Sequence, residues 1–211
     1  MPCEAFVRCS PQQGYVVWRI TESEAVLRQR MATTLDLASC NAISHPIKRK
    51  EWLATRLAYQ YLCQTMKLPC APIQKDNAGR PYVEASTAKP PPYISLSHSF
   101  PFAAAMLSSN QPIGLDIEKP TSKLLRIAAK YLTPTEIVDC NADLEKHCIY
   151  WSAKEAIYKA YAHSQSLDLS SIQIHPFIKA GAGALQGYTP YGHQYTVQYF
   201  LHQEYVLTWC S

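Results

Sequence analysis

Residues 151–159, with the sequence Trp-Ser-Ala-Lys-Glu-Ala-Ile-Tyr-Lys, constrain the fold of this chain more than any other stretch. A helical period of 3.6 residues places Trp151, Glu155 and Tyr158 on one stripe, so a carboxylate projects from an otherwise apolar face. A charge in such surroundings is unfavourable unless a cation compensates it. Lys159, one turn further on, and a bound metal ion are the two candidate cations. An ordinary Glu-to-Lys pair on a solvated helix is the alternative interpretation.

A second acidic pattern lies in residues 113–118, which are predicted to form a β-strand. Asp116 and Glu118 are two residues apart, and side chains alternate along a strand, so both carboxylates point to the same face. Like charges this close repel each other unless a cation lies between them. Two or three carboxylates and a substrate phosphate suit Mg²⁺, which prefers oxygen ligands. A solvent-facing acidic strand end is the alternative.

Basic residues gather at the start of a predicted helix. The apolar spacing of residues 47–66 is typical of an amphipathic helix, and Lys48, Arg49 and Lys50 fall in its first turn. The helix dipole disfavours cations there by roughly 0.3–1 kcal/mol each. A bound anion would reverse this preference, because free N–H groups and cationic side chains at a helix start together form a phosphate site. A solvated basic cluster explains the pattern equally well.

Two more polar residues lie where predicted elements end. Residues 75–81, Lys-Asp-Asn-Ala-Gly-Arg-Pro, have the composition of a turn, which would present Arg80 on a stiff loop. Residues 93–99 are predicted to form a strand that ends near His98. A lone histidine at a strand end is more often a satisfied polar residue than a reacting group.

The rest of the chain contains both helical and strand patterns. Capping boxes are predicted at Thr21 with Glu24 and at Thr133 with Glu136. Further strands are predicted at residues 14–20, 102–108, 195–201 and 205–210, and further helices from Ser122 and from Asp143 to about His163. Both halves run from helix to strands to a closing hairpin, which hints at an internal duplication. The pattern predicts an α+β fold.

Composition narrows the class of protein. The 211 residues are 47% hydrophobic and 17% charged, which is typical of a globular protein of one large domain or two small ones. The net charge of +4 is too low for a nucleic-acid-binding domain but suits an anionic small molecule or an acidic partner. The eight cysteines lack zinc-binding spacing, and we expect them to be reduced. The start lacks a signal peptide and the longest apolar run is too short to cross a membrane, so we expect a cytoplasmic protein.

At these residues the sequence resembles the 4′-phosphopantetheinyl transferases, in particular the larger, surfactin-synthetase-activating type built as a pseudo-dimer in one chain. The matching motifs are Gly79-Arg80-Pro81, Ser95-Leu96-Ser97-His98-Ser99, Gly114-Leu115-Asp116-Ile117-Glu118, Tyr131-Leu132-Thr133-Pro134-Thr135-Glu136 and residues 151–159. They keep the family's order from about residue 45 to residue 160. The resemblance implies an α+β fold of two similar halves, residues 1–109 and 110–211, that form an intramolecular pseudo-dimer.

The resemblance also implies site residues. Asp116, Glu118 and Glu155 would bind Mg²⁺ against the pyrophosphate of coenzyme A. The catalytic residues would be Glu155, Lys159 and His98, with Glu155 also helping to deprotonate the attacking serine. Coenzyme A would be bound by Arg49, Arg80, Ser97, His98 and Lys159, with the two arginines at its 3′-phosphate. Arg28 and Arg30 are further basic candidates without an aligned counterpart in the family.

The implied reaction moves the phosphopantetheine arm of coenzyme A onto a serine of an apo acyl or peptidyl carrier protein and releases 3′,5′-ADP, as in enzymes of the holo-acyl-carrier-protein synthase type. Such a reaction needs charge neutralisation on two phosphates and an alcohol held in line. The expected partners are coenzyme A and the carrier, without nucleic acid or membrane, and a monomer is expected. One alternative is a non-catalytic coenzyme A-binding or carrier-docking module on the same fold. A plain α+β scaffold with solvated charges is the other.

Overall fold

The structure, a computed structural model, describes residues 3–31, 37–77, 79–84, 91–161 and 167–211. The chain divides into two compact units, Met1–Pro112 and Ile113–Ser211. Each unit combines an antiparallel sheet with helices, which confirms the predicted α+β class. Within the described part of the chain, every helix is too short or too polar to cross a membrane.

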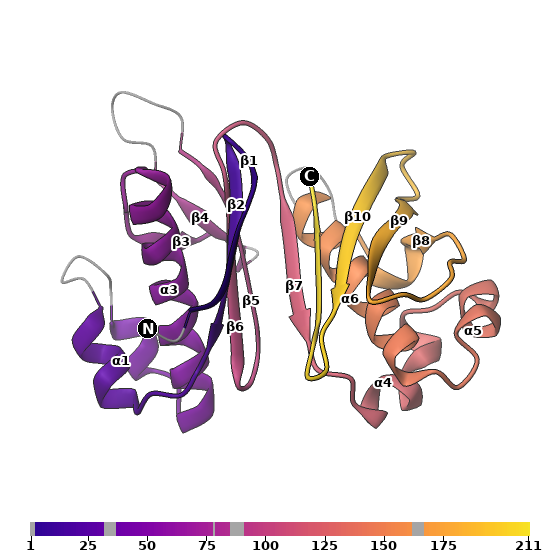
Figure 1. The fold of residues 1–211 in the computed structure, drawn as a ribbon, viewed down its shortest axis with the longest axis horizontal. Coiled ribbons are helices and arrows are strands. Elements are labelled where there is room, and N and C mark those ends of the chain that lie inside the picture. The colour runs from indigo at the N-terminus through magenta and orange to yellow at the C-terminus, as the bar shows by residue number, and fades with distance from the viewer. Residues whose placement is uncertain (1–2, 32–36, 78, 85–90, 162–166) are drawn as a thin grey trace. The chain divides into compact units, whose positions relative to one another are not determined.

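The N-terminal unit is a four-stranded antiparallel sheet with one long helix on its face (Figure 1). Its strands, in spatial order, are β1 (Cys3–Ser10), β2 (Gln13–Arg19), β6 (Phe102–Ser108) and β5 (Tyr93–Ser99). Helix α3 (Pro46–Met66) begins with a proline at its first turn, where a missing N–H removes no helical hydrogen bond. The predicted helix over residues 47–66 is therefore confirmed.

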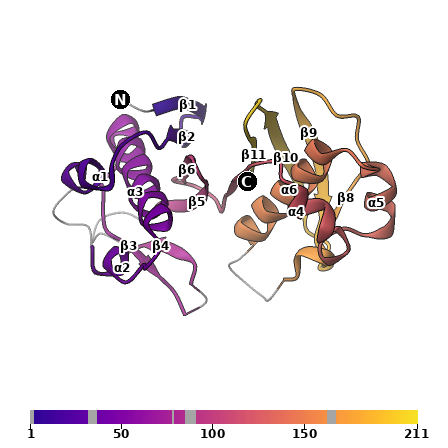
Figure 2. The same ribbon diagram turned by 90° about the horizontal axis from the view of Figure 1, so that it is seen from below.

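The core of this unit consists of apolar residues that recur every second position in the strands and every three to four positions in α3. Val16 and Trp18 of β2 lie on the same face of the sheet, and Leu53 and Leu57 of α3 pack with them in one buried cluster. Alanines in β6 let the helix approach the sheet. The shorter helices α1 (Glu24–Arg30) and α2 (Ala38–Asn41) and the hairpin of β3 (Ile73–Lys75) and β4 (Pro81–Val83) complete the unit (Figure 2).

One predicted helix start is wrong. The cap of α1 is Ser23, whose hydroxyl accepts the Val26 N–H, and the predicted Thr21–Glu24 capping box does not form. Both Thr21 and Ser23 have side chains suited to capping, and the helix begins two residues later than predicted. The predicted Thr133–Glu136 capping box is confirmed, because Thr133 and Glu136 each accept the other's backbone N–H.

The C-terminal unit is a five-stranded antiparallel sheet in the order β7-β11-β10-β9-β8. The strands are β7 (Gly114–Glu118), β8 (Gln173–Ile174), β9 (Ala182–Tyr188), β10 (Gln194–Leu201) and β11 (Val206–Cys210). The helical segments are α4 (Ser122–Arg126), η1 (Ala128–Lys130), α5 (Pro134–Cys140), α6 (Leu144–Tyr161) and η2 (Leu169–Ser171). The predicted end of α6 near His163 lies outside the described residues.

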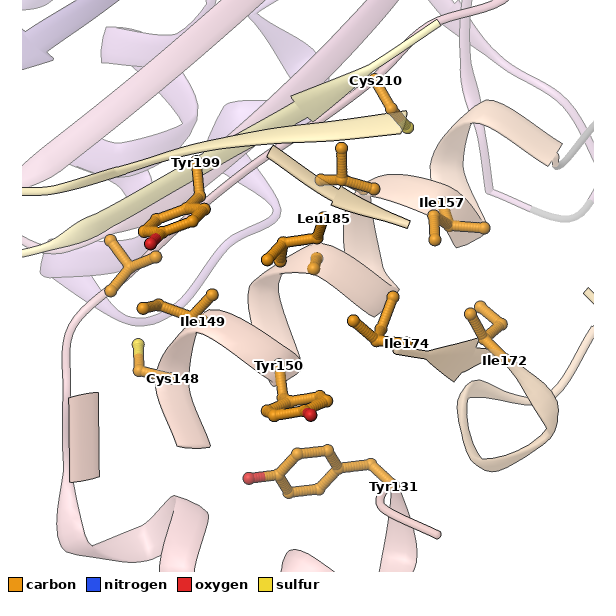
Figure 3. Packing of buried hydrophobic residues seen from close by; sticks show 14 of the residues in the cluster. Tyr131, Cys148, Ile149, Tyr150, Ile157, Ile172, Ile174, Leu185, Tyr199 and Cys210 are labelled. Atoms are coloured by element: carbon orange, nitrogen blue, oxygen red, sulfur yellow. The ribbon is translucent and has the colours of Figure 1, made fainter. Parts of the chain in front are cut away.

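Helix α6 packs along the sheet of this unit. Ile149 and Ile157 project from α6 toward Leu185 and Tyr199 of the sheet, and all four belong to one buried cluster (Figure 3). Burial of apolar surface of this kind contributes roughly 25 cal/mol per Å², so α6 is held mainly by its apolar contacts.

The backbones of β7 and α6 approach closely at Gly114. A Cβ atom at Gly114 would overlap the carbonyl oxygen of Ala156 and lie 2.9 Å from the Ala160 nitrogen. Only glycine fits at this point, because any side chain would push the helix away from the strand. Gly114, Asp116 and Glu118 alternate with Leu115 and Ile117, so the close contact also turns both carboxylates of β7 toward the helix side.

We predict that Gly114→Ala destabilises the protein by about 1–3 kcal/mol, the usual range for overpacking, because the added methyl group must separate β7 from α6. The free energy of unfolding is measured by urea denaturation. Gly181→Ala is the matched control, since nothing lies within 4 Å of a Cβ atom at Gly181. Equal stability of the two variants would show that the contact is not tight.

Candidate functional site

Asp116 lies in the middle of β7 and is ion-paired with Lys159 of α6. The Lys159 Nζ lies 2.8 Å from Asp116 Oδ1 and also donates a hydrogen bond of 3.0 Å to the Leu115 carbonyl oxygen. Asp116 is only 5% exposed. A buried carboxylate needs a cation, and here the lysine supplies one. The structure therefore brings together two residues that the sequence predicted to share a site, although they are far apart along the chain.

Glu155 lies one turn before Lys159 and is electrostatically coupled to both carboxylates of β7. Burial, together with the negative charges of Asp116 and Glu118, raises the pKa of Glu155 to about 7, while Lys159 opposes the rise. Glu155 is thus partly desolvated and lies in the field of two further carboxylates. A divalent cation bound among them would relieve this repulsion.

The three carboxylates suit Mg²⁺ in ligand type but do not form a complete cage. Across the described ranges, no three His, Cys, Asp or Glu side chains are close enough together to hold a metal ion by themselves. Mg²⁺ commonly takes one or two protein carboxylates and completes its shell with water and substrate phosphate. The donor atoms of Asp116, Glu118 and Glu155 fit that habit, and their assignment as metal ligands stays a prediction.

Two buried hydroxyl groups connect β11, the strand next to Asp116 in the sheet, to α6. Thr208 of β11 is paired with Asp116 in the sheet register, and its Oγ1 donates a hydrogen bond of 2.7 Å to the Ser152 carbonyl oxygen of α6. The Ser152 and Thr208 hydroxyl oxygens lie 3.0 Å apart, and both residues are fully buried. These contacts fix α6 against the sheet beside the acidic residues. The sequence analysis missed them, because no local pattern links residues so far apart.

Lys154 has a structural role, although it is adjacent to Glu155. Its Nζ lies 2.7 Å from Glu136 Oε2 and donates a hydrogen bond of 2.7 Å to the Tyr131 carbonyl oxygen. The other Glu136 oxygen accepts the Ile174 N–H at 2.8 Å. This buried, fully hydrogen-bonded pair ties together α5, α6 and β8, and removing one partner would leave the other charge uncompensated.

The predicted stripe of Trp151, Glu155 and Tyr158 lines a pocket of about 490 Å³. All three residues are half-buried: Trp151 and Tyr158 pack against the core cluster of this unit and also border the pocket. The remaining lining residues are Ile127, Lys130, Tyr131, Leu167, Asp168, Leu169 and Ser170. The pocket is thus largely apolar, with the Glu155 carboxylate on its wall.

His98 of the N-terminal unit lies beside a buried carboxylate. Its Nδ1 is 3.3 Å from Oε2 of Glu51, and the same oxygen lies 2.8 Å from the Lys48 Nζ. Ser97 precedes His98 in β5 and is mostly buried; alternation along the strand turns the two side chains to opposite faces. The sequence analysis missed Glu51. The sequence signal that could have identified Glu51 is an acidic residue directly after three basic ones.

The two arginines predicted at the 3′-phosphate lie in different surroundings. Arg49 Nε is 3.0 Å from Glu24, and Arg49 Nη1 donates hydrogen bonds to the carbonyl oxygens of Ile43 and Ser44. Arg80 follows the turn at Gly79, where φ is +79°, and no hydrogen-bond partner for its buried Nε lies among the described residues. Arg49 is therefore held by contacts within its own unit, which the described residues do not provide for the Arg80 Nε.

Other arginines of this unit also differ in whether a carboxylate pairs with them. Arg28 and Arg30 pair with Glu24 and Glu22, respectively. Arg56 of α3 is 8% exposed, stacks on the Trp52 ring at 4.0 Å and donates a hydrogen bond to Thr55. The described carboxylates form no ion pair with Arg56, which makes this residue an anion-binding candidate that the sequence analysis did not select.

Comparisons with known proteins agree with this arrangement. A family model described as the 4′-phosphopantetheinyl transferase superfamily matches residues 112–210, which contain Asp116, Glu118, Glu155 and Lys159. A 4′-phosphopantetheinyl transferase of Bacillus subtilis is 31% identical over 140 residues, which are 63% of this chain and 59% of that protein. The transferase gsp of Aneurinibacillus migulanus is 25% identical over 129 residues, 58% of this chain and 52% of the relative.

The transferase Sfp of Bacillus subtilis strain 168 is 34% identical over 90 residues, 40% of each protein. The chain thus matches between 40% and 59% of the length of these curated relatives. The resemblance drawn from the motifs is confirmed by these matches.

We predict that Glu155→Gln makes the metal-free protein more stable than the wild type at pH 8 but not at pH 5. The folded-state pKa of Glu155 is raised to about 7, so its favourable neutral form is present at low pH and lost as the pH rises through 7. The uncharged amide avoids that loss, which we expect to amount to about 1–2 kcal/mol for a partly exposed group.

Urea denaturation with a chelator present, at pH 5 and pH 8, measures the difference. Glu84→Gln, at an exposed position, is the control and should show no such dependence. A Glu155→Gln stability gain that is equal at both pH values would contradict the electrostatic account.

Proposed function

We propose that this chain, whose residues 112–210 are a domain of the 4′-phosphopantetheinyl transferase superfamily, is a Mg²⁺-dependent 4′-phosphopantetheinyl transferase. It would transfer the phosphopantetheine arm of coenzyme A to a serine of an apo acyl or peptidyl carrier protein and release 3′,5′-ADP. The observation that supports this best is the coupling of Glu155 to Asp116 and Glu118, with Lys159 on Asp116, inside the matched region.

The C-terminal unit supplies the groups that such a transfer needs. Asp116, Glu118 and Glu155 would hold Mg²⁺, which when bound neutralises charge on the pyrophosphate. Lys159 is a second cation at the same place and can donate hydrogen bonds to phosphate oxygens. In the reaction, the serine oxygen forms a bond to the β-phosphorus while the bond from that phosphorus to the leaving 3′,5′-ADP breaks.

Glu155 is the candidate base. Its carboxylate would accept the serine proton, directly or through a water molecule that it orients. No covalent enzyme intermediate is required. The scattered free cysteines agree with this, since none is needed for the chemistry.

The pocket beside Glu155 suits the arm that is transferred. Phosphopantetheine beyond its phosphate is an extended, uncharged chain, and Trp151 and Tyr158 offer apolar surface next to the carboxylate. We assign the pocket to this arm, because a chain bound there would bring its phosphate end toward Glu155.

The N-terminal unit would bind phosphate groups of the coenzyme. His98, with Ser97, and the arginines Arg49 and Arg80 are the residues assigned to this role from the resemblance. The proposal also includes two related halves at residues 1–109 and 110–211, a pseudo-dimeric monomer and a cytoplasmic location. In support, each unit has a long helix packed on an antiparallel sheet. The carrier could belong to fatty-acid, polyketide or peptide synthesis.

We predict that the protein, given Mg²⁺ and coenzyme A, adds the phosphopantetheine mass to an apo carrier, and that Asp116→Ala lowers the rate by about 100-fold or more, because charge stabilisation at the phosphates is lost. Intact-mass spectrometry of the carrier measures the transfer. Glu145→Ala is the control, since Glu145 pairs with Lys179 on the surface. Coenzyme A binding without any mass gain over a broad carrier panel would favour the non-catalytic binding module.

We predict that Arg49→Ala raises the KM for coenzyme A more than the KM for 3′-dephospho-coenzyme A, because a lost 3′-phosphate contact affects only the first substrate. Arg49 is also ion-paired with Glu24, so Glu24→Gln is the matched control for loss of that pair alone. Steady-state kinetics with both substrates measures the difference. Equal KM changes for the two substrates would remove Arg49 from the 3′-phosphate site.

A further inference from the structure

We infer that Glu51 is a positioning residue that holds the His98 imidazole with Nδ1 turned toward the protein and Nε2 turned toward a bound phosphate. The identity of the bound group rests on the proposed function, whereas the orientation rests on the contacts around Glu51.

Glu51 is a buried acid in a basic turn. It lies in α3 directly after Lys48, Arg49 and Lys50 and is 2% exposed. A carboxylate at such a position is unfavourable unless its oxygens are satisfied. Although burial raises the pKa of Glu51, the close contacts of its carboxylate with His98 and Lys48 bring it down to about 2. In its ionised form Glu51 can only accept hydrogen bonds.

Its two oxygens hold different partners. Oε1 accepts the Phe100 N–H at 3.0 Å, and Oε2 lies 3.3 Å from His98 Nδ1 and 2.8 Å from Lys48 Nζ. Phe100 lies in the turn between β5 and β6, two residues after His98. One carboxylate therefore fixes both the ring and the backbone of the turn that follows it.

This arrangement decides which ring nitrogen faces outward. A carboxylate can only accept, so it favours an N–H on the nitrogen that faces it, Nδ1, and Nε2 can then donate to a phosphate oxygen only when the ring carries both protons. The His98 side chain is 40% exposed, so part of the ring remains accessible while Nδ1 faces the buried acid. Lys48, with a 57% exposed side chain, is held by the same oxygen. Glu51 thus holds Lys48 and, once the ring carries both protons, His98 as two donors that suit a phosphate group.

Glu51→Gln is the variant that tests this role, because the amide oxygen can still accept the Phe100 N–H while the charge facing Nδ1 is lost. In wild-type protein labelled with ¹⁵N at histidine, we expect the His98 ring to carry a proton on Nδ1 without ligand and on both nitrogens when inorganic phosphate is bound. The His98→Ala spectrum assigns the signal. In Glu51→Gln we expect the Nδ1 preference to be lost and kcat/KM for coenzyme A to fall roughly tenfold, as for other orienting partners of histidine.

A double variant separates positioning from a general structural effect. If Glu51 acts through His98, adding Glu51→Gln to His98→Ala changes kcat/KM no further. An equal loss in both backgrounds would overturn the inference, as would a wild-type His98 that carries its proton on Nε2 alone. The second observation needs no variant, so the test stands even if Glu51→Gln does not fold.

The same experiments keep the two proposals apart. A wild-type protein that neither binds 3′,5′-ADP nor modifies a carrier would contradict the proposed function. The ring-proton measurement would still decide whether Glu51 orients His98, because it requires no substrate.

Discussion

The contact between Gly114 and the backbone of Ala156 is the constraint on which the C-terminal unit depends. It brings β7 against α6 more closely than any side chain would allow, and it sets the depth at which Asp116 meets Lys159. The hydroxyl contacts of Thr208 and Ser152 hold the neighbouring strand to the same helix. Apolar burial provides most of the stability, but these short polar and backbone contacts determine the position of the charged groups.

The three carboxylates of α6 and β7 lower the stability of the fold but serve the proposed chemistry. Glu155 is partly desolvated beside two further carboxylates, which raises its pKa and makes its ionised form unfavourable in the absence of a cation. A protein selected for stability alone would place an uncharged side chain there. The same repulsion that weakens the fold would favour the binding of a divalent cation, so the unfavourable interaction is useful in the proposed reaction.

The features of the fold and the site that depend on residues close together in the chain could be predicted from local sequence patterns. The periodicity of α3, the alternation that pairs Asp116 with Glu118 and the Thr133–Glu136 capping box are of this kind. Strand β1 was missed, since it is largely exposed and shows no regular alternation of buried residues. The Glu51–His98 contact and the Arg49–Glu24 pair join distant segments, and no local pattern specifies them.

The buried pair of Lys154 and Glu136 limits which insertions and deletions α6 can accept. Successive residues of an α-helix are rotated by roughly 100°, so Lys154 and Glu155 leave α6 in different directions. Because Lys154 is anchored to α5, it locks the rotational setting of α6 about its own axis. A single residue inserted between these neighbours would swing the glutamate away from β7 without altering composition or charge. Length changes should therefore be excluded from this stretch and tolerated in the loops around it.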